Sequence, residues 1–165
     1  LVAGGSGASG DASNTAEIYD PANNTWSSAP NIGAPRLVPA LTTLSTGDTL
    51  LSGGIQVTLF FGIPIAIIST TSTQLFDPNT NSWSGGASMP SGRAFHHDNQ
   101  VTLNDGRVLL SGGADNELRK HASAETHDPS TDTWTEVASK IWTCSKIRSN
   151  HEIRAFQSGA SEITS

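Results

Sequence analysis

The side chains with the most direct chemical potential are histidines, and two of them, His96 and His97, are adjacent in the chain. Paired imidazoles often begin a zinc or copper site. The surrounding pattern predicts a strand, however, and neighbouring strand residues point to opposite faces, so the two rings cannot easily share one ion. We expect one ring to be buried and the other to face an open channel. His121 and His127 add no ligand spacing, so we expect no metal or other cofactor.

Two arginines, Arg36 and Arg93, each follow a tryptophan by ten residues, at Trp26 and Trp83. A guanidinium at such a matched position could recognise a substrate, or it could bind loop carbonyls or the aspartate of an adjacent turn. The structural role is the favoured interpretation. The single cysteine, Cys144, has no activating motif around it, and we interpret it as a plain thiol.

The arginines belong to a larger repeat. An Asp-Pro pair precedes a tryptophan by six positions three times, in AEIYDPANNTW, TQLFDPNTNSW and AETHDPSTDTW. A short aliphatic run closed by two glycines precedes each of them: LVAGG, LLSGG and LLSGG. The structural motif of the repeat consists of Gly4, Gly5, Asp20, Trp26, Gly53, Gly54, Asp77, Trp83, Gly112, Gly113, Asp128 and Trp134. Elements recurring in a fixed order at a fixed period indicate a repeat architecture.

Each element has a physical reason. The glycine pair permits positive φ angles and lets neighbouring backbone approach a strand end closely. The Asp-Pro pair ends the next strand, because proline cannot donate to a ladder and the aspartate can bond backbone N–H groups two residues on. The tryptophan begins the returning strand and offers a large apolar surface to a neighbouring sheet. The residues from Arg93 through Leu103 and from Arg107 to Leu110 predict another hairpin, about the turn Asn104-Asp105-Gly106.

Each unit is therefore predicted to be a four-stranded antiparallel meander of about 50 residues. One meander leaves an apolar face exposed, so such units should pack around a common axis. In these motifs the chain resembles the kelch family, and most of all the bacterial kelch repeats similar to the propeller of galactose-oxidase-like proteins. Phe76 and His127 depart from the pattern by replacing the tyrosine found at Tyr19.

The resemblance implies an all-β fold, a partial kelch-type β-propeller with two complete four-stranded blades and two partial ones. We expect the propeller segment to cover residues 1–139, with a partial blade at about 1–30 and blades at 34–90 and 91–139. Residues 140–165 would be a degenerate partial blade or an unrelated tail, since the repeat stops there. The charge of this tail also differs, because it has 2 acidic and 4 basic residues, whereas residues 1–139 have 13 acidic and 5 basic residues. We expect the chain to be a fragment, or to need neighbours that cover its open faces.

The resemblance also implies a ligand face, built from the loops that enter the innermost strand and those that join the second strand to the third. The first kind are 29–36 and 86–93, and the second kind are 55–73 and 114–123. Loop 55–73 reads VTLFFGIPIAII at its centre and predicts a protruding apolar hairpin, which could pack on a neighbour or contact a ligand. The candidate binding-face residues are Arg36, Phe60, Phe61, Ile63, Arg93, His96 and Arg119.

Composition narrows the classes of partner. The net charge of −6 argues against a nucleic-acid surface, which needs clustered lysine and arginine. No apolar run is long enough to span a membrane as a helix. We expect a protein or carbohydrate ligand, together with further blades of the same protein or self-association, and by resemblance an extracellular or cell-surface location.

The resemblance to galactose oxidase invites an enzymatic alternative, a copper-radical oxidase. That chemistry uses two tyrosines, two histidines and a cysteine cross-linked to one of the tyrosines. This chain has one tyrosine, Tyr19, which belongs to the repeat, and Cys144 lies beyond the repeats. We therefore expect a non-catalytic binding or scaffolding module. The alternative is a non-catalytic propeller portion of a larger secreted oxidase or carbohydrate-active enzyme.

Overall fold

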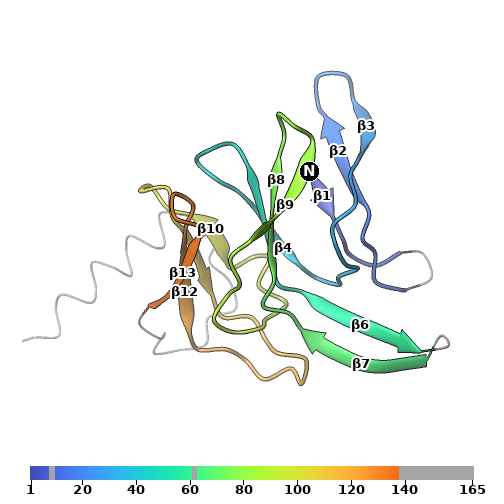
Figure 1. The fold of residues 1–165 in the computed structure, drawn as a ribbon, viewed down its shortest axis with the longest axis vertical. Coiled ribbons are helices and arrows are strands. Elements are labelled where there is room, and N and C mark those ends of the chain that lie inside the picture. Colours follow the sequence, from blue (N-terminus) through green and yellow to red (C-terminus); the bar gives the residue numbers. More distant parts are fainter. Residues whose placement is uncertain (8–9, 61–62, 138–165) are drawn as a thin grey trace, which may run out of the picture.

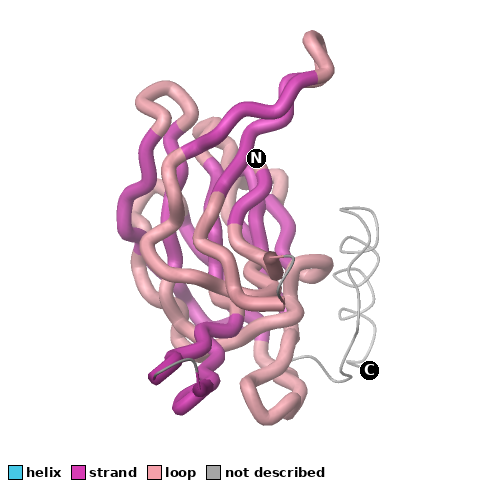
Figure 2. Tube along the Cα trace, turned by 90° about the vertical axis from the view of Figure 1, so that its right-hand side faces the viewer, coloured by secondary structure: helices cyan, strands magenta, loops and turns pink. Residues whose placement is uncertain are grey.

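The computed structural model describes residues 1–7, 10–60 and 63–137. All helices and strands assigned within these ranges are β-strands (Figures 1 and 2). No helix in these ranges is long and apolar enough to cross a membrane. The thirteen strands are β1 (Val2–Ala3), β2 (Ala16–Asp20), β3 (Thr25–Ala29), β4 (Ala40–Thr43), β5 (Thr49–Ser52), β6 (Ile55–Phe60), β7 (Ile63–Ser69), β8 (Thr73–Asp77), β9 (Ser82–Gly86), β10 (Gln100–Thr102), β11 (Val108–Ser111), β12 (Ala124–Asp128) and β13 (Thr133–Val137).

The strands form blades. Two sheets are complete four-stranded antiparallel meanders, in the orders β4-β5-β8-β9 (blade 2) and β10-β11-β12-β13 (blade 3). A third sheet, β1-β2-β3 (blade 1), supplies the outer three strands of the same pattern. The all-β, partial propeller predicted from the repeat is therefore confirmed. The tail 140–165 lies outside the described residues.

The innermost strands of blades 2 and 3 lie side by side. The Gln100 side chain donates to Thr42 Oγ1 at 2.9 Å, and the Thr102 hydroxyl donates to the Thr43 carbonyl at 2.6 Å. These bonds join β4 to β10 through side chains rather than through a ladder. This is the arrangement of neighbouring blades about a propeller axis.

The Asp-Pro turns close the outer hairpins in the same way in all three blades. Oδ1 of Asp20, Asp77 and Asp128 accepts the backbone N–H two residues on, at 2.8–2.9 Å. The residue two before each tryptophan has a positive φ of 47–53°, and it is asparagine or aspartate in every copy: Asn24, Asn81 and Asp132. These residue types tolerate the left-handed region better than most, which explains their place in the repeat.

Trp83 and Trp134 pack toward the preceding blade. Trp83 of blade 2 joins the core cluster that it shares with Ala29 and Ile32, and its indole N–H donates to the Pro30 carbonyl at 2.8 Å. Trp134 of blade 3 packs on the cluster of Leu44, Leu50 and Val108. Trp26 of blade 1 packs against Tyr19 of its own blade and is 56% exposed, because the described residues form no blade before blade 1. The core therefore lies between blades, as the repeat predicts.

The glycine pairs bind the loop of the next blade through backbone hydrogen bonds. The Gly5 N–H donates to the Arg36 carbonyl at 2.8 Å, and the Gly54 N–H donates to the Arg93 carbonyl at 2.9 Å. A Cβ on Gly53 would lie 2.3 Å from that same Arg93 carbonyl oxygen, and the φ of Gly53 is 58°. Both the conformation and the close approach require glycine there.

One prediction about the inner strands is wrong. The residues from Arg93 to Asn99 form a loop, and β10 begins at Gln100. Phe95 has a φ of 58°, which turns the chain out of the extended conformation. Val38, two residues after Arg36, has a φ of 45°. The same turn therefore follows both arginines and delays the inner strand of each blade.

Candidate binding face

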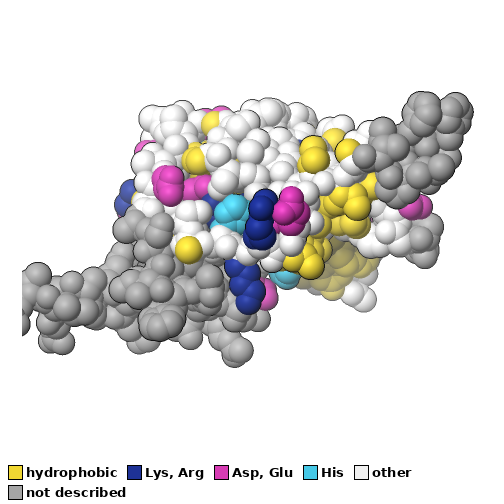
Figure 3. All heavy atoms as spheres, turned by 90° about the horizontal axis from the view of Figure 1, so that it is seen from below, with side chains coloured by type: hydrophobic (Ala, Val, Ile, Leu, Met, Phe, Trp, Pro, Cys, Tyr) yellow, Lys and Arg dark blue, Asp and Glu magenta, His cyan; other side chains and the backbone are white. Residues whose placement is uncertain are grey.

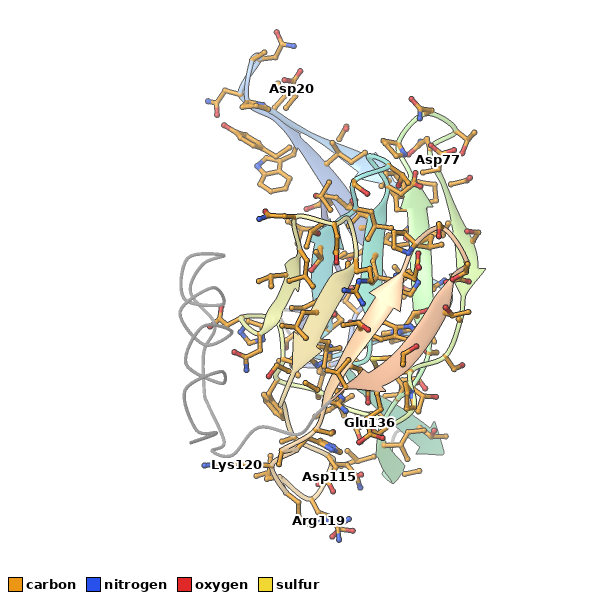
Figure 4. The ribbon with its side chains drawn as sticks, turned by 90° about the vertical axis from the view of Figure 1, so that its left-hand side faces the viewer. Asp20, Asp77, Asp115, Arg119, Lys120 and Glu136 are labelled. Carbon is orange, nitrogen blue, oxygen red and sulfur yellow. The ribbon has the colours of Figure 1, made fainter. Side chains whose placement is uncertain are left out.

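The predicted ligand loops gather at one end of the molecule. In Figure 4 the side chains of Asp115, Arg119 and Lys120 lie at one end of the blades, and the turn residues Asp20 and Asp77 lie at the other. The β6–β7 hairpin leaves the body at the same end as the first set (Figures 1 and 4). The strands thus separate the structural turns from the candidate face.

Arg36 and Arg93 lie beneath this face. Their side chains are 3% and 0% exposed. The Arg36 guanidinium donates to the carbonyls of Gly53 and Ser72 at 3.1 and 2.9 Å. The Arg93 guanidinium donates to the carbonyls of Gly112 and Ser123 at 2.9 and 3.3 Å. Each arginine therefore binds its own blade through its side chain and the preceding blade through its backbone carbonyl. This geometry favours the structural role over direct ligand contact.

The two arginines differ in charge compensation. Arg93 forms an ion pair with Glu125, which is 1% exposed, and also donates to the hydroxyls of Ser91 and Ser123 at 2.6 and 3.0 Å. Arg36 has no acidic partner among the described residues, and burial lowers its pKa to about 10. Blade 2 carries Gln74 where blade 3 carries Glu125, since both follow the first residue of the third strand. Blade 3 thus holds its arginine with a charge that blade 2 lacks.

His96 is also interior. It is fully buried, its Nε2 lies 3.0 Å from Ser52 Oγ, and Ser52 in turn bonds to Gln100. Burial, with a smaller contribution from the Arg93 charge, lowers the pKa of His96 to about 3. The imidazole is therefore neutral at pH 7 and joins blades 2 and 3. His97 is exposed, so the two rings do lie apart, although the reason is a loop rather than the predicted strand.

The sequence argument missed the apolar side chains on this face. Phe95 is 41% exposed and Leu118 is 67% exposed. The segments that carry them are joined, since Ala94 and Ala114 exchange hydrogen bonds of 2.8 and 2.9 Å. Both residues have positive φ angles, 58° and 61°, which is uncommon for large apolar residues and clusters at functional sites. The position of Phe95 two residues after Arg93 was the available sequence clue.

Arg119 is exposed beside Leu118. Its guanidinium donates to Asp115 Oδ2 at 2.7 Å and lies 3.2 Å from Glu117 Oε2. The hydrogen bond from Arg119 lowers the pKa of Asp115, and the same bond raises the pKa of Arg119. Asp115 Oδ1 also accepts the backbone N–H groups of Glu117 and Arg119. Asp115 therefore organises a charged loop that presents Leu118 at its tip.

The predicted hairpin is present. β6 and β7 pair antiparallel from Ile55↔Ser69 to Phe60↔Ile63, so the backbones of two candidate residues, Phe60 and Ile63, lie near its tip. Phe61 lies outside the described residues. Ile67 and Ile68 are 50% and 48% exposed. Seen from this end, the surface shows hydrophobic side chains next to basic, acidic and histidine side chains (Figure 3).

The described part of the chain does not bring together the residues that a copper-radical site uses. Within residues 1–7, 10–60 and 63–137 no three of histidine, cysteine, aspartate and glutamate lie close enough to hold a metal. Tyr19 stacks on Trp26 with ring centroids 5.1 Å apart and donates to Asn24 Oδ1 at 2.9 Å, in the outer turn of blade 1. Tyr19 is therefore a structural residue, and its neighbour in the chain, Asp20, lies at the opposite end of the blades from the candidate face (Figure 4).

Comparison with known sequences agrees with the repeat. Residues 1–33 match the family model described as the kelch motif. The chain is 37% identical over 71 residues to beta-scruin of Limulus polyphemus, covering 43% of this chain and 7% of that protein. It is 36% identical over 78 residues to an F-box/kelch-repeat protein of Arabidopsis thaliana, covering 46% of this chain and 16% of that protein. The chain thus spans a small part of the relatives that it matches.

Solved structures agree on the fold. A fungal alcohol oxidase of the AA5 family, in complex with copper, superposes with a TM-score of 0.55 and 18% identity, over 80% of this chain and 25% of that one. The protein YjhT superposes with a TM-score of 0.60 and 16% identity, over 80% of this chain and 53% of that one. At these identities the likeness concerns the propeller fold alone.

Proposed function

The chain is built of kelch repeats, and from this we propose that it is a binding or scaffolding module that holds a protein or carbohydrate ligand on its loop face. The observation that carries the proposal is the exposure of Leu118 beside the Asp115–Arg119 ion pair, together with the exposure of Phe95. Apolar side chains surrounded by hydrogen-bonding groups suit both an apolar protein surface and the faces of sugar rings. The similarity to beta-scruin and to an F-box/kelch-repeat protein supports a binding role, because kelch repeats are generally protein-interaction modules.

The backbone of the face supports the same proposal. A large residue in the left-handed region costs of order 1–3 kcal/mol, and such strain persists where the surrounding structure fixes it. The positive φ of Phe95 belongs to the turn that also follows Arg36, but Phe95 is exposed where its counterpart Val38 is partly buried, and Leu118 is exposed too, so packing does not explain the choice of an apolar side chain. A requirement to contact a ligand does explain it.

The test separates ligand contact from folding. Asparagine tolerates positive φ, so Phe95→Asn with Leu118→Asn removes the apolar surface without adding strain. The labelled chain would be applied to an oligosaccharide array and to a protein array. The matched control is Val2→Thr, which removes an apolar side chain of similar exposure, 52%, from β1.

We expect the double variant to lose at least tenfold in affinity for the ligands that bind the original chain on the arrays. Val2→Thr should bind these ligands as before, and both variants should melt at or above the temperature of the original chain. Binding on only one of the two arrays would show whether the ligand is a carbohydrate or a protein. Binding that is unchanged by the double variant, or lost equally in Val2→Thr, would contradict this face as the ligand site. The absence of any retained ligand would contradict the binding module.

A second candidate is the propeller portion of a larger oxidase or carbohydrate-active enzyme. Its supporting observation is the fold shared with the copper-containing alcohol oxidase, of which this chain spans a quarter. A longer sequence with a second tyrosine, a cysteine and two spaced histidines would favour it. Copper-dependent oxidation of primary alcohols by that longer protein would then replace the pure scaffold proposal.

A further inference from the structure

Arg36 carries a buried charge that no acidic side chain of the described residues compensates. Burial lowers its pKa to about 10, which still leaves the guanidinium charged at pH 7. Its Nη1 makes both side-chain hydrogen bonds, to the carbonyls of Gly53 and Ser72. Nη2 makes no hydrogen bond within the described part of the chain and, unlike Nε, is not sealed from solvent. Buried charges are normally paired, so Nη2 is the candidate contact for an anion.

The matched arginine of blade 3 shows which group fits this place. Arg93 uses Nη1 for two backbone carbonyls, as Arg36 does. Its Nη2 donates to the hydroxyls of Ser91 and Ser123, at 2.6 and 3.0 Å, and to the carboxylate of Glu125. The carboxylate supplies the counter-charge, and the serines complete the hydrogen bonds. A carboxylate is therefore the anion that this position holds when the blade itself provides one.

The three counterparts in blade 2 do not take this role. Ala34 stands two residues before the arginine, where blade 3 has a serine, and it has no hydroxyl. The hydroxyl of Ser72 is bonded to that of Thr70, at 3.0 Å. Gln74 stands where blade 3 has the glutamate, and its Oε1 accepts the Gly33 N–H at 3.2 Å. Blade 2 thus keeps the arginine of the site and lacks the carboxylate.

A ligand can reach this place from the loop side. Gly33 and Pro35 are exposed, and Gln74 is partly exposed. The bond between Gln74 and Gly33 is at the long limit of N–H···O hydrogen bonds, so little holds the amide in place. Rotation of the Gln74 side chain frees the Gly33 N–H. That N–H, the Gln74 amide nitrogen and Arg36 Nη2 are then three donors for one carboxylate.

We propose that Arg36, with Gly33 and Gln74, binds the carboxylate of a small organic acid in blade 2, at the place that the glutamate carboxylate has in blade 3. A small ligand is favoured because the Arg36 side chain is only 3% exposed, so a compact group must enter between the loop and the strand. A neutral ligand would leave the buried charge uncompensated. The proposal does not rest on the ligand of Phe95 and Leu118.

The experiment titrates the full chain, labelled with ¹⁵N, with sodium acetate and follows the Arg36 side-chain resonances by NMR. Sodium chloride at the same ionic strength is the comparison. The key variant is Gln74→Glu, which supplies within blade 2 the carboxylate that blade 3 has. The matched control is Asn79→Asp, which makes the same amide-to-carboxylate change in the exposed outer turn of the same blade. A second variant, Ala34→Ser, adds the hydroxyl that in blade 3 donates to the carboxylate at 2.8 Å.

We expect acetate, and not chloride, to shift the Arg36 resonances to saturation in the original chain and in Asn79→Asp. Gln74→Glu should raise the dissociation constant for acetate by at least about tenfold, and Ala34→Ser should lower it. Four results would each overturn the proposal: no saturable shift, an equal shift with chloride, unchanged acetate binding in Gln74→Glu, or an equal loss in Asn79→Asp. Failure of acetate where a peptide rich in aspartate and glutamate shifts the same resonances would replace the small acid with a protein side chain.

Discussion

At the scale of single residues, the two buried arginines have the same position but different partners. Arg93 is neutralised by Glu125, and both side chains are almost completely inaccessible to water. Breaking a buried ion pair by removing one partner is costly, because the other charge stays buried without compensation. The stability of blade 3 should therefore depend on this pair more than on any surface pair.

Arg93→Met is expected to lower the free energy of unfolding by about 3–5 kcal/mol. Adding Glu125→Gln should restore part of that loss, since a neutral amide is less costly to bury than a carboxylate. Arg107→Met is the control, because Arg107 and Asp105 form a pair that is about half exposed and should matter little. Denaturant titration measures all of these. A loss for Arg93→Met no larger than for Arg107→Met would show that the buried pair is not stabilising.

His96 predicts a dependence of stability on pH. Its folded pKa of about 3 lies below the ordinary unfolded value near 6.5. Above pH 6.5 both states are neutral, and the full stability is present. As the pH falls from 6.5 toward 3, His96 becomes protonated in the unfolded state but stays neutral in the folded state. The free energy of unfolding therefore falls by about 1.4 kcal/mol per pH unit.

The measurement is denaturant unfolding at several values between pH 7.5 and pH 5.5. That range lies about one pH unit or more above the ordinary pKa of Asp and Glu, so the contribution of carboxylates is small. His121, whose pKa burial also lowers, adds loss in the same direction. The variant His96→Gln should flatten most of the slope. A slope that is the same with and without His96 would assign the effect to other groups.

At the scale of elements, the repeat predicted the strands because each boundary has a local cause in the sequence. Aspartate and proline end one strand, and a glycine pair ends another, so blades 2 and 3 and their outer hairpins follow from spacing. The late start of β10 did not follow, because the left-handed conformation of Phe95 is imposed by tertiary contacts and not by its residue type. The exposure of Phe95 and Leu118 could not be predicted for the same reason. Burial of Arg93 and His96 depends on the neighbouring blade, which no local pattern describes.

The glycine pairs give the element-scale prediction. Gly53→Ala would place a Cβ 2.3 Å from the Arg93 carbonyl oxygen and 2.6 Å from the His96 ring, at a φ of 58°. Strain and overpacking together should lower the free energy of unfolding by about 2–5 kcal/mol. Gly85→Ala is the control, because no atom lies within 4 Å of its Cβ position. Thermal unfolding compares the two. Equal melting temperatures would show that the blade 2 turn can open to admit a side chain.

At the scale of the whole molecule, blade 2 is held on both sides. Trp83 and the Arg36 carbonyl tie it to blade 1, and the Thr42–Gln100 bond ties it to blade 3. Asp132 adds a further link to blade 3, because its Oδ2 accepts the Ala87 N–H at 2.9 Å while Oδ1 lies 2.9 Å from His127 Nε2. Units that contact their neighbours so closely should unfold together, although each repeat has its own sheet.

Hydrogen exchange of the core amides tests this coupling. Asp132→Gly, which tolerates the positive φ of this position, removes the partner of both the Ala87 N–H and His127 and should lower the free energy of opening by about 1–2 kcal/mol. We expect an equal loss at Leu51 of blade 2 and Leu110 of blade 3, because cooperative blades share one opening reaction. Asp128→Ala, which removes bonds to Ser130 alone in the same turn, should have a smaller effect at both. A loss confined to Leu110 would mean that the blades open independently and that their mutual bonds position them without coupling their stability.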